Sequence, residues 1–153
     1  MSATEKRKIY SLKAKAMSAR LSSVQAVYQA AQNEQSMSDV LAEFLEHRSG
    51  MEIDGEELVK PDSILLKKIL LGAEERAGDI EALVQDNIKK EGQGGELLLK
   101  SILVCATFEL LANLDVDAPI IINDYLNVAH SFYAPGEVSF VNAVLDSISK
   151  TVR

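Results

Sequence analysis

Apolar residues in the first part of the chain recur at the spacing of one helical face. No glycine or proline occurs before Gly50, so nothing in this part interrupts a helix. The pattern predicts a long first helix that includes at least residues 12–33, and a second helix over residues 38–48. The acidic stretch that follows, residues 49–61, contains two glycines and ends at Pro61, and it is predicted to be a loop. The apolar positions of the first helix are Ile9, Leu12, Ala16, Val24, Val27, Tyr28 and Ala31.

The same periodicity predicts five further helices. Pro61 suits the first turn of the third helix, a fourth begins near Asp79, and Pro135 and Gly136 separate the last two. A glycine-rich link at residues 91–95 is the best internal boundary. We therefore predict an all-α fold of about seven helices: one domain of residues 1–153, with packed helical subdomains at about residues 1–90 and 96–153. The remaining predicted helices cover residues 61–77, 96–113, 120–133 and 137–152.

Composition supports this prediction and adds a strong asymmetry of charge. Apolar residues make up 47% of the 153 residues but aromatic residues only 5%, a balance that favours helices over strands. The net charge is −7, yet residues 1–20 contain six basic side chains and one acidic one, a balance of +5. The remaining residues therefore carry −12. Charge separated in this way indicates a binding role for the basic end.

Several classes of function find no support in the sequence. The single cysteine, Cys105, lies in an apolar run at residues 97–111, which is shorter than the ~20 residues needed to cross a bilayer. No signal peptide is recognisable, and one cysteine forms no internal disulfide, so we expect a cytoplasmic protein. The two histidines have no metal-ligand spacing, and no nucleophile or phosphate-loop motif occurs. We expect no enzyme activity, no metal and no cofactor.

The basic first helix is instead a candidate for binding RNA. Lysine and arginine side chains on one helix replace counterions along a nucleic-acid backbone, and tyrosines offer faces on which bases stack. A protein that binds duplex DNA is normally more basic than this one, whose pI is about 4.9. Local binding of a short single strand of RNA is the better expectation.

Two segments carry a resemblance to a known family. SARLSSVQAVYQA at residues 18–30 and FELLANLDVDAPIIINDYLNVAHSFYAPGEVSFVNAVLD at residues 108–146 resemble, in order and spacing, the bacterial transcription antitermination factor NusB. The first matches the family pattern Ala-Arg-x-x-(Ala/Ser)-Val-Gln-Ala-Leu-Tyr. The second matches Tyr-Glu-Leu, Ile-Asn-Glu and Phe-Val-Asn-Gly-Val-Leu-Asp. The resemblance implies an all-helical protein that binds boxA RNA and NusE, a small-subunit ribosomal protein. It also implies that the complex joins RNA polymerase and promotes read-through of ribosomal RNA operons.

The resemblance also implies which residues bind RNA, although the chain departs from the family at four places. Met17-Ser18 stands where Arg-Arg is usual, and Leu99, Val104 and Ser139 replace a common acid and two basic residues. We therefore expect the more upstream lysines and the one matching arginine to make most of the phosphate contacts. The expected RNA-binding residues are Lys13, Lys15, Arg20, Gln25, Tyr28, Phe140 and Asn142.

Two alternatives remain open at this point. One is an RNA-free helical adaptor or homodimer, whose basic helix would contact an acidic patch on a protein. The other is the RNA-targeting module of a ribosomal RNA methyltransferase, which shares the helical fold. The length of 153 residues argues against a second, cofactor-binding domain.

Overall fold

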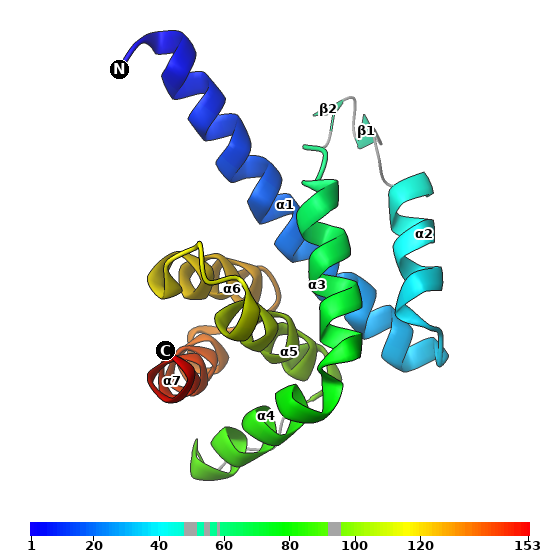
Figure 1. Cartoon of the computed structure of the whole chain (residues 1–153), viewed down its shortest axis with the longest axis vertical. Coiled ribbons are helices and arrows are strands. Elements are labelled where there is room, and N and C mark those ends of the chain that lie inside the picture. Colours follow the sequence, from blue (N-terminus) through cyan, green and yellow to red (C-terminus); the bar gives the residue numbers. More distant parts are fainter. Residues whose placement is uncertain (48–51, 54–55, 58, 92–95) are drawn as a thin grey trace.

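The computed structural model describes the whole chain except residues 48–51, 54–55, 58 and 92–95. Within the described part the chain forms seven helices and one pair of very short strands, which confirms the predicted all-α class (Figure 1). The elements are α1 (Ala3–Asn33), α2 (Met37–His47), β1 (Glu52–Ile53), β2 (Glu56–Glu57), α3 (Ser63–Glu75), α4 (Ala77–Glu91), α5 (Leu97–Ala112), α6 (Ala118–Phe132) and α7 (Pro135–Val152).

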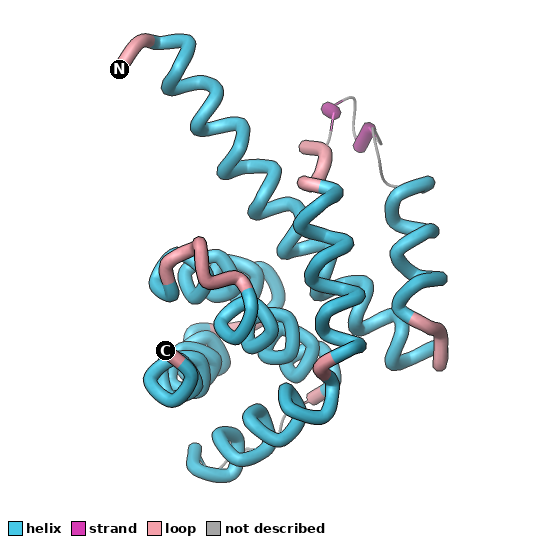
Figure 2. The backbone as a smooth tube through the Cα atoms, in the orientation of Figure 1, coloured by secondary structure: helices cyan, strands magenta, loops and turns pink. Residues whose placement is uncertain are grey.

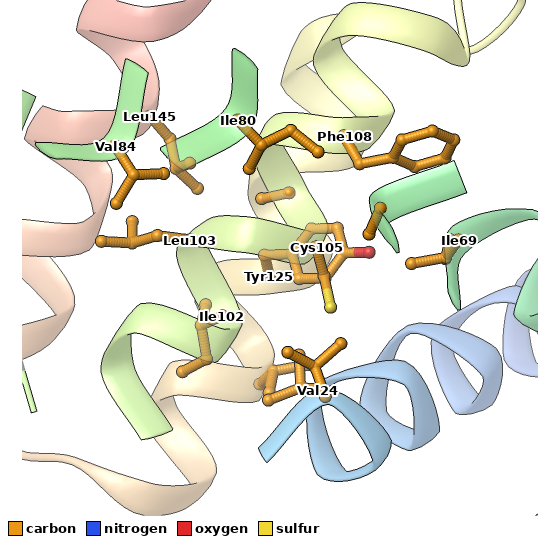
Figure 3. Close-up of a cluster of buried hydrophobic side chains, with 14 of the residues drawn as sticks. Val24, Ile69, Ile80, Val84, Ile102, Leu103, Cys105, Phe108, Tyr125 and Leu145 are labelled. Atoms are coloured by element: carbon orange, nitrogen blue, oxygen red, sulfur yellow. The ribbon is translucent and has the colours of Figure 1, made fainter. Parts of the chain in front are cut away.

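Helix α5 lies at the centre of the fold. It packs against α1, α3, α4, α6 and α7, and its sequence is apolar on every side, as is typical of a buried helix. Figure 3 shows the core around it, where Leu103 and Cys105 of α5 meet Val24 of α1, Val84 of α4 and Leu145 of α7. The helix that carries the most apolar part of the sequence therefore organises the others.

The helices form two groups around α5. On one side α1 packs against α2 and α3, and on the other α4 and α6 pack against α7. Helix α4 packs closely with α5 and α7, whereas the subdomain boundary expected at residues 91–95 groups it with the helices before it. Most of that glycine-rich link lies outside the described residues.

Three helix starts that lie beside a proline differ from the sequence expectation. The Asp62 side chain accepts hydrogen bonds from the backbone N–H groups of Ile64 and Leu65 (both 3.1 Å), so Asp62 caps α3 and Pro61 lies before the helix. Pro119 and Pro135 lie in the first turns of α6 and α7, where a missing N–H group costs no helical hydrogen bond. The predicted loop at residues 49–61 contains the antiparallel pair β1–β2, in which Glu52 pairs with Glu57.

Helix α1 begins at Ala3, before the minimum range of residues 12–33 that the sequence predicts, and Ser2 and Glu5 form a capping box at its start. The Glu5 N–H donates to the Ser2 hydroxyl (3.1 Å), and the Ser2 N–H donates to the Glu5 carboxylate (3.2 Å). The first turns of α1 extend beyond the other helices (Figure 2). The basic residues therefore lie on a helix, and its first half projects from the body of the protein.

Candidate RNA and protein interfaces

A buried ionic network joins α1 to α5 and α6. The Arg20 guanidinium donates two hydrogen bonds to the Glu109 carboxylate (both 2.8 Å) and one to Asp124 (2.9 Å). Glu109 also accepts from the Tyr125 hydroxyl (2.6 Å) and the Asn113 amide (2.9 Å). Arg20 and Glu109 are 3% and 0% exposed, so water contributes little to their solvation. The fork-shaped pairing compensates the loss of solvation.

The network alters the acid–base properties of the groups in it. Burial by itself lowers the pKa of the Arg20 guanidinium, but the hydrogen bonds and negative charge of Glu109 outweigh burial and raise it above its ordinary value. Burial, with the charge of Glu109 in second place, raises the pKa of the Tyr125 hydroxyl and of the Cys105 thiol. These groups therefore keep their protons over the whole neutral range.

The expectation that Arg20 faces a phosphate at the surface is corrected by this geometry. Ala19 and Arg20 both lie on the side of α1 that packs into the body of the protein, and all three donor directions used by Arg20 lead to carboxylates. Its partners are 89 and 104 residues away along the chain. A signal was present in the sequence: Glu109 is an acid inside the most apolar run of the chain, and a buried acid requires a cationic partner.

The two predicted lysines are exposed but lie on different sides of α1. Residues two apart on a helix point about 160° away from each other. Lys13 lines a groove between α1, α3 and α6, and Lys15 is not part of its lining. The lysines that look adjacent in sequence therefore form no single cluster.

A hollow of about 320 Å³ brings together aromatic and amide side chains further along α1. Gln25 and Tyr28 line it with Phe132, which ends α6 and is 44% exposed. The Tyr28 hydroxyl accepts a hydrogen bond from the Gln32 amide (2.8 Å). The sequence analysis did not select Phe132, and its position in the last turn of its helix, where a core stripe runs out, was the available signal.

The two predicted residues of α7 have opposite surroundings. Phe140 is 5% exposed and belongs to the core with Val141 and Val144, which corrects the expectation that it contacts RNA directly. Asn142 is exposed. The two side chains are two positions apart on the helix and so point in nearly opposite directions, which explains why one is buried and the other is not.

Exposed acids lie at the end of α3 and along α4, where Glu81 points nearly opposite to Asp79 and Asp86; the side that carries Glu74 and Glu81 is called the acidic face of α4. Glu74, Glu75, Asp79, Glu81 and Asp86 are all exposed there. Glu74 and Glu81 also line a cavity of about 390 Å³ together with one cation, Lys100, and its otherwise mostly apolar walls come from α1, α2, α3, α4 and α5. This surface combines negative charge with an apolar hollow, the combination that suits a basic protein partner.

No group of three or more His, Cys, Asp or Glu side chains within the described part of the chain is placed to hold a metal ion. None of the described helices has the length and apolar character that a membrane span requires.

Comparison with known proteins identifies the family. The NusB family model matches residues 17–150. Transcription antitermination protein NusB of Allorhizobium ampelinum is 36% identical over 137 residues, covering 88% of this chain and 86% of that protein. The Novosphingobium aromaticivorans protein of the same name is also 36% identical, covering 88% and 93%.

Solved structures show the same fold. T. maritima NusB superimposes with a TM-score of 0.70 at 20% sequence identity, covering 88% of this chain and 89% of that one. A crystal structure of antitermination factors NusB and NusE in complex with dsRNA superimposes with a TM-score of 0.72 at 16% identity, covering 93% and 98%. The family model and the sequence relatives together show that this chain belongs to the NusB family of transcription antitermination proteins, which are not enzymes.

Proposed function

We propose that this protein binds boxA-type RNA through α1 and, together with NusE and RNA polymerase, promotes read-through transcription of ribosomal RNA operons in the cytoplasm. The observation that carries the proposal is the exposed hollow at Tyr28, which lies on the same helix as the basic residues. Membership of the NusB family supports it, as does the solved complex of NusB and NusE with dsRNA.

The direction of the side chains on α1 gives the RNA a path. Lys6 and Lys13 are seven residues apart and share one side of the helix, and Tyr28 lies within about 60° of Lys13 and about 22 Å further along. An RNA strand on this side would meet the ammonium groups first and the hollow next. Lys15 points about 140° away from Tyr28, so its contribution should be smaller.

The hollow is suited to an unstacked base. Tyr28 and Phe132 offer aromatic faces, and Gln25, Gln29 and Gln32 place amide groups around them. Stacking with hydrogen bonds to base edges is how proteins read single-stranded RNA, and one stacked base is worth ~1 to 3 kcal/mol. We therefore infer that a single strand is preferred over a duplex, with Asn142 as a further polar contact on α7.

Arg20 and Phe140 are not proposed to contact RNA directly. Arg20 fixes α1 against α5 and α6 through Glu109 and Asp124, and Phe140 fills the core beneath Asn142. Both are positioning residues that hold the RNA-binding side chains in place. Lys13, Lys15, Gln25, Tyr28 and Asn142 remain the proposed direct contacts.

The acidic face of α4 is the proposed docking surface for NusE. A ribosomal protein is rich in basic side chains, so Glu81 and its neighbours attract it, while the cavity lined by Val84, Leu97 and Val104 accepts an apolar side chain. This face and the hollow at Tyr28 are close neighbours, because Val27 and Leu97 line the cavity while the adjacent Tyr28 and Leu98 line the hollow. NusE and RNA would then bind together, with a coupling of ~1 to 3 kcal/mol if they also touch each other.

The test is RNA binding by three charge-reversal variants, measured by fluorescence anisotropy with a labelled single-stranded boxA RNA. Lys13→Glu should weaken binding at least tenfold, Lys15→Glu by a smaller factor, and Lys89→Glu, a matched change on the exposed side of α4, very little. The salt dependence of log K should become shallower by roughly 0.7 for each phosphate that a variant no longer neutralises. Equal affinity of wild type and Lys13→Glu, or a preference for duplex RNA, would contradict the proposed path.

Docking of NusE is tested separately by pull-down with and without boxA RNA. Glu81→Lys should reduce NusE capture, while Asp146→Lys, which reverses an exposed acid on α7, should not. RNA should increase the amount captured by the wild type. Full capture by Glu81→Lys would remove the acidic face of α4 from the proposal.

A further inference from the structure

A second groove, of about 970 Å³, lies between α1, the start of α3 and the turn that joins α5 to α6. We call it the α1–α3–α6 groove. Its walls carry exposed aliphatic side chains: Ile64 is 81% exposed, Leu12 58% and Ile120 53%. Ile9 precedes Leu12 by one turn on the same helix face and is 40% exposed. Aliphatic residues gathered in this way on a surface mark an interaction site more often than scattered ones do.

The groove is preformed by contacts within the chain. The Asp62 N–H donates to the Lys15 carbonyl (3.0 Å), which fixes the start of α3 on α1. Arg153 donates hydrogen bonds to the carbonyls of Leu110 (2.9 Å) and Val116 (2.8 Å), which hold the α5–α6 turn. Both walls are therefore in place before a partner arrives, which lowers the entropy cost of binding.

Two ammonium groups on the rim of this groove are available to a ligand. The two acids of the groove are engaged, since the Asp124 carboxylate pairs with Arg20 and the Asp62 carboxylate caps α3. Within the part of the chain that the structure describes, the ammonium groups of Lys13 and Lys68 form no ion pair, and Lys68 approaches only the neutral side chain of Asn113 (3.4 Å). A ligand with negative charges beside an apolar surface would match this rim.

We propose that the α1–α3–α6 groove binds an amphipathic helix of a protein partner that has an aliphatic face and acidic flanks. A helix laid in a groove presents side chains at i, i+3, i+4 and i+7, and these would pack on Leu12, Ile64 and Ile120 while acids meet Lys13 and Lys68. A basic ribosomal protein does not suit this rim. RNA would leave the aliphatic side chains without apolar partners.

The groove lies away from the proposed RNA hollow. Ala16 lines the groove and Gln25 lines the hollow, and residues nine apart on a helix point about 180° from each other. Lys13, however, lines the groove and also lies on the proposed RNA path, so an acidic partner and RNA would compete for that side chain, whereas the rest of the groove stays clear of the hollow. The proposal goes beyond RNA and NusE binding and does not depend on either.

The test uses a designed helical peptide as the probe. A fluorescein-labelled 18-residue peptide with leucines at i, i+3, i+4 and i+7 and glutamates on both flanks is titrated with the full-length protein. Its two controls have lysines in place of the glutamates, or the same composition in scrambled order. We expect saturable binding of the acidic peptide at least tenfold tighter than either control, with amide shifts in a ¹H–¹⁵N spectrum centred on the groove.

Variants then locate the site. Ile64→Glu should weaken peptide binding at least tenfold. The control is Leu45→Glu, which changes a leucine of α2 that is 39% exposed and should leave peptide binding unchanged. Lys68→Glu should weaken the acidic peptide and favour the lysine peptide. Because Ile64 is so exposed, Ile64→Glu should fold normally, and circular dichroism checks this. If its folding is impaired, Ile64→Ser is used in its place.

Four outcomes would overturn the proposal. The first is binding of the lysine peptide as tight as that of the acidic one, and the second is no saturable binding of the acidic peptide. The third is a loss of boxA RNA affinity in the uncharged variant Ile64→Ser, which would assign the groove to RNA. The fourth is a dimer of the wild type in sedimentation that Ile64→Glu abolishes, which would make a second copy the occupant. RNA binding measured on the same variants keeps this test separate from the one for RNA.

Discussion

The two halves of α1 have opposite roles although they form one continuous helix. From Ala3 to about Lys15 the side chains are mostly exposed and six of the first twenty residues are basic. From Ala19 to Ala30 most positions are buried against α5, α3 and α2. Arg20 lies at the junction, and its charge is used inside the protein. The comparison teaches that a basic residue in a basic segment is a surface ligand only if no carboxylate is packed against it.

The largest expected effect on stability comes from removing the charge of Arg20, at the junction of the two halves of α1. Arg20→Ala leaves Glu109 as a buried carboxylate without its cation, and we expect the free energy of unfolding to fall by about 3 to 5 kcal/mol. Urea unfolding followed by circular dichroism measures this loss. The double variant Arg20→Met with Glu109→Met, which removes both charges, should recover part of it. A loss below about 1 kcal/mol for Arg20→Ala would show that the pair is not buried as described.

Matched truncations, one in each half of α1, should produce smaller losses of stability that differ between the halves. Val24→Ala removes two methyl groups from a site that is 0% exposed, and we expect a loss on the order of 2 kcal/mol. Leu12→Ala removes more atoms from a site that is 58% exposed, and its effect should stay within about 0.5 kcal/mol. Urea midpoints at constant slope provide the measurement. Equal losses would mean that the first half of α1 is covered in solution.

The smallest effect is a pH dependence that belongs to the buried half. The Cys105 thiol is protonated in the folded protein, because burial and Glu109 raise its pKa. The unfolded thiol loses its proton near a pH of about 8.5. The folded state then binds more protons, so stability is complete below that pH and falls as the pH rises above it.

Between pH ~7.5 and ~9.5 this thiol should cost the wild type about 1.4 kcal/mol of unfolding free energy. Cys105→Ala should lose correspondingly less over the same interval, measured by urea unfolding under reducing conditions. Lys13→Glu is the control from the exposed half and should keep the wild-type dependence. The same dependence in Cys105→Ala would contradict the role of the thiol.

Helical periodicity alone was sufficient for most of the architecture. Apolar residues at helical spacing predicted all seven helices of the described chain, because each helix buries one face against the core. The misplaced ends were those at Pro61, Pro119 and Pro135, where proline is compatible both with a break and with a first helical turn. The grouping of α4 with α5 and α7 depends on tertiary packing, which no local pattern contains.

The candidate sites were harder to predict, since exposure depends on residues far away in sequence. Arg20 and Phe140 belong to family motifs, yet Arg20 meets carboxylates of α5 and α6 and Phe140 meets the core. Lys13 and Lys15 look like a cluster in sequence but point to different sides of one helix. The α1–α3–α6 groove was invisible for the same reason, because its aliphatic side chains come from three separate helices.

The long separation between Arg20 and its partners has a consequence for the order of folding during synthesis. Asp124 follows Arg20 by 104 residues, and at ~5 to 20 residues per second roughly 5 to 20 s pass on the ribosome before it is made. Until Glu109 and then Asp124 have been made, α1 lacks one or both of the carboxylates that fix it, and closing so long a loop adds an entropic cost. The helix that is synthesised first is therefore among the last to be locked into the folded protein.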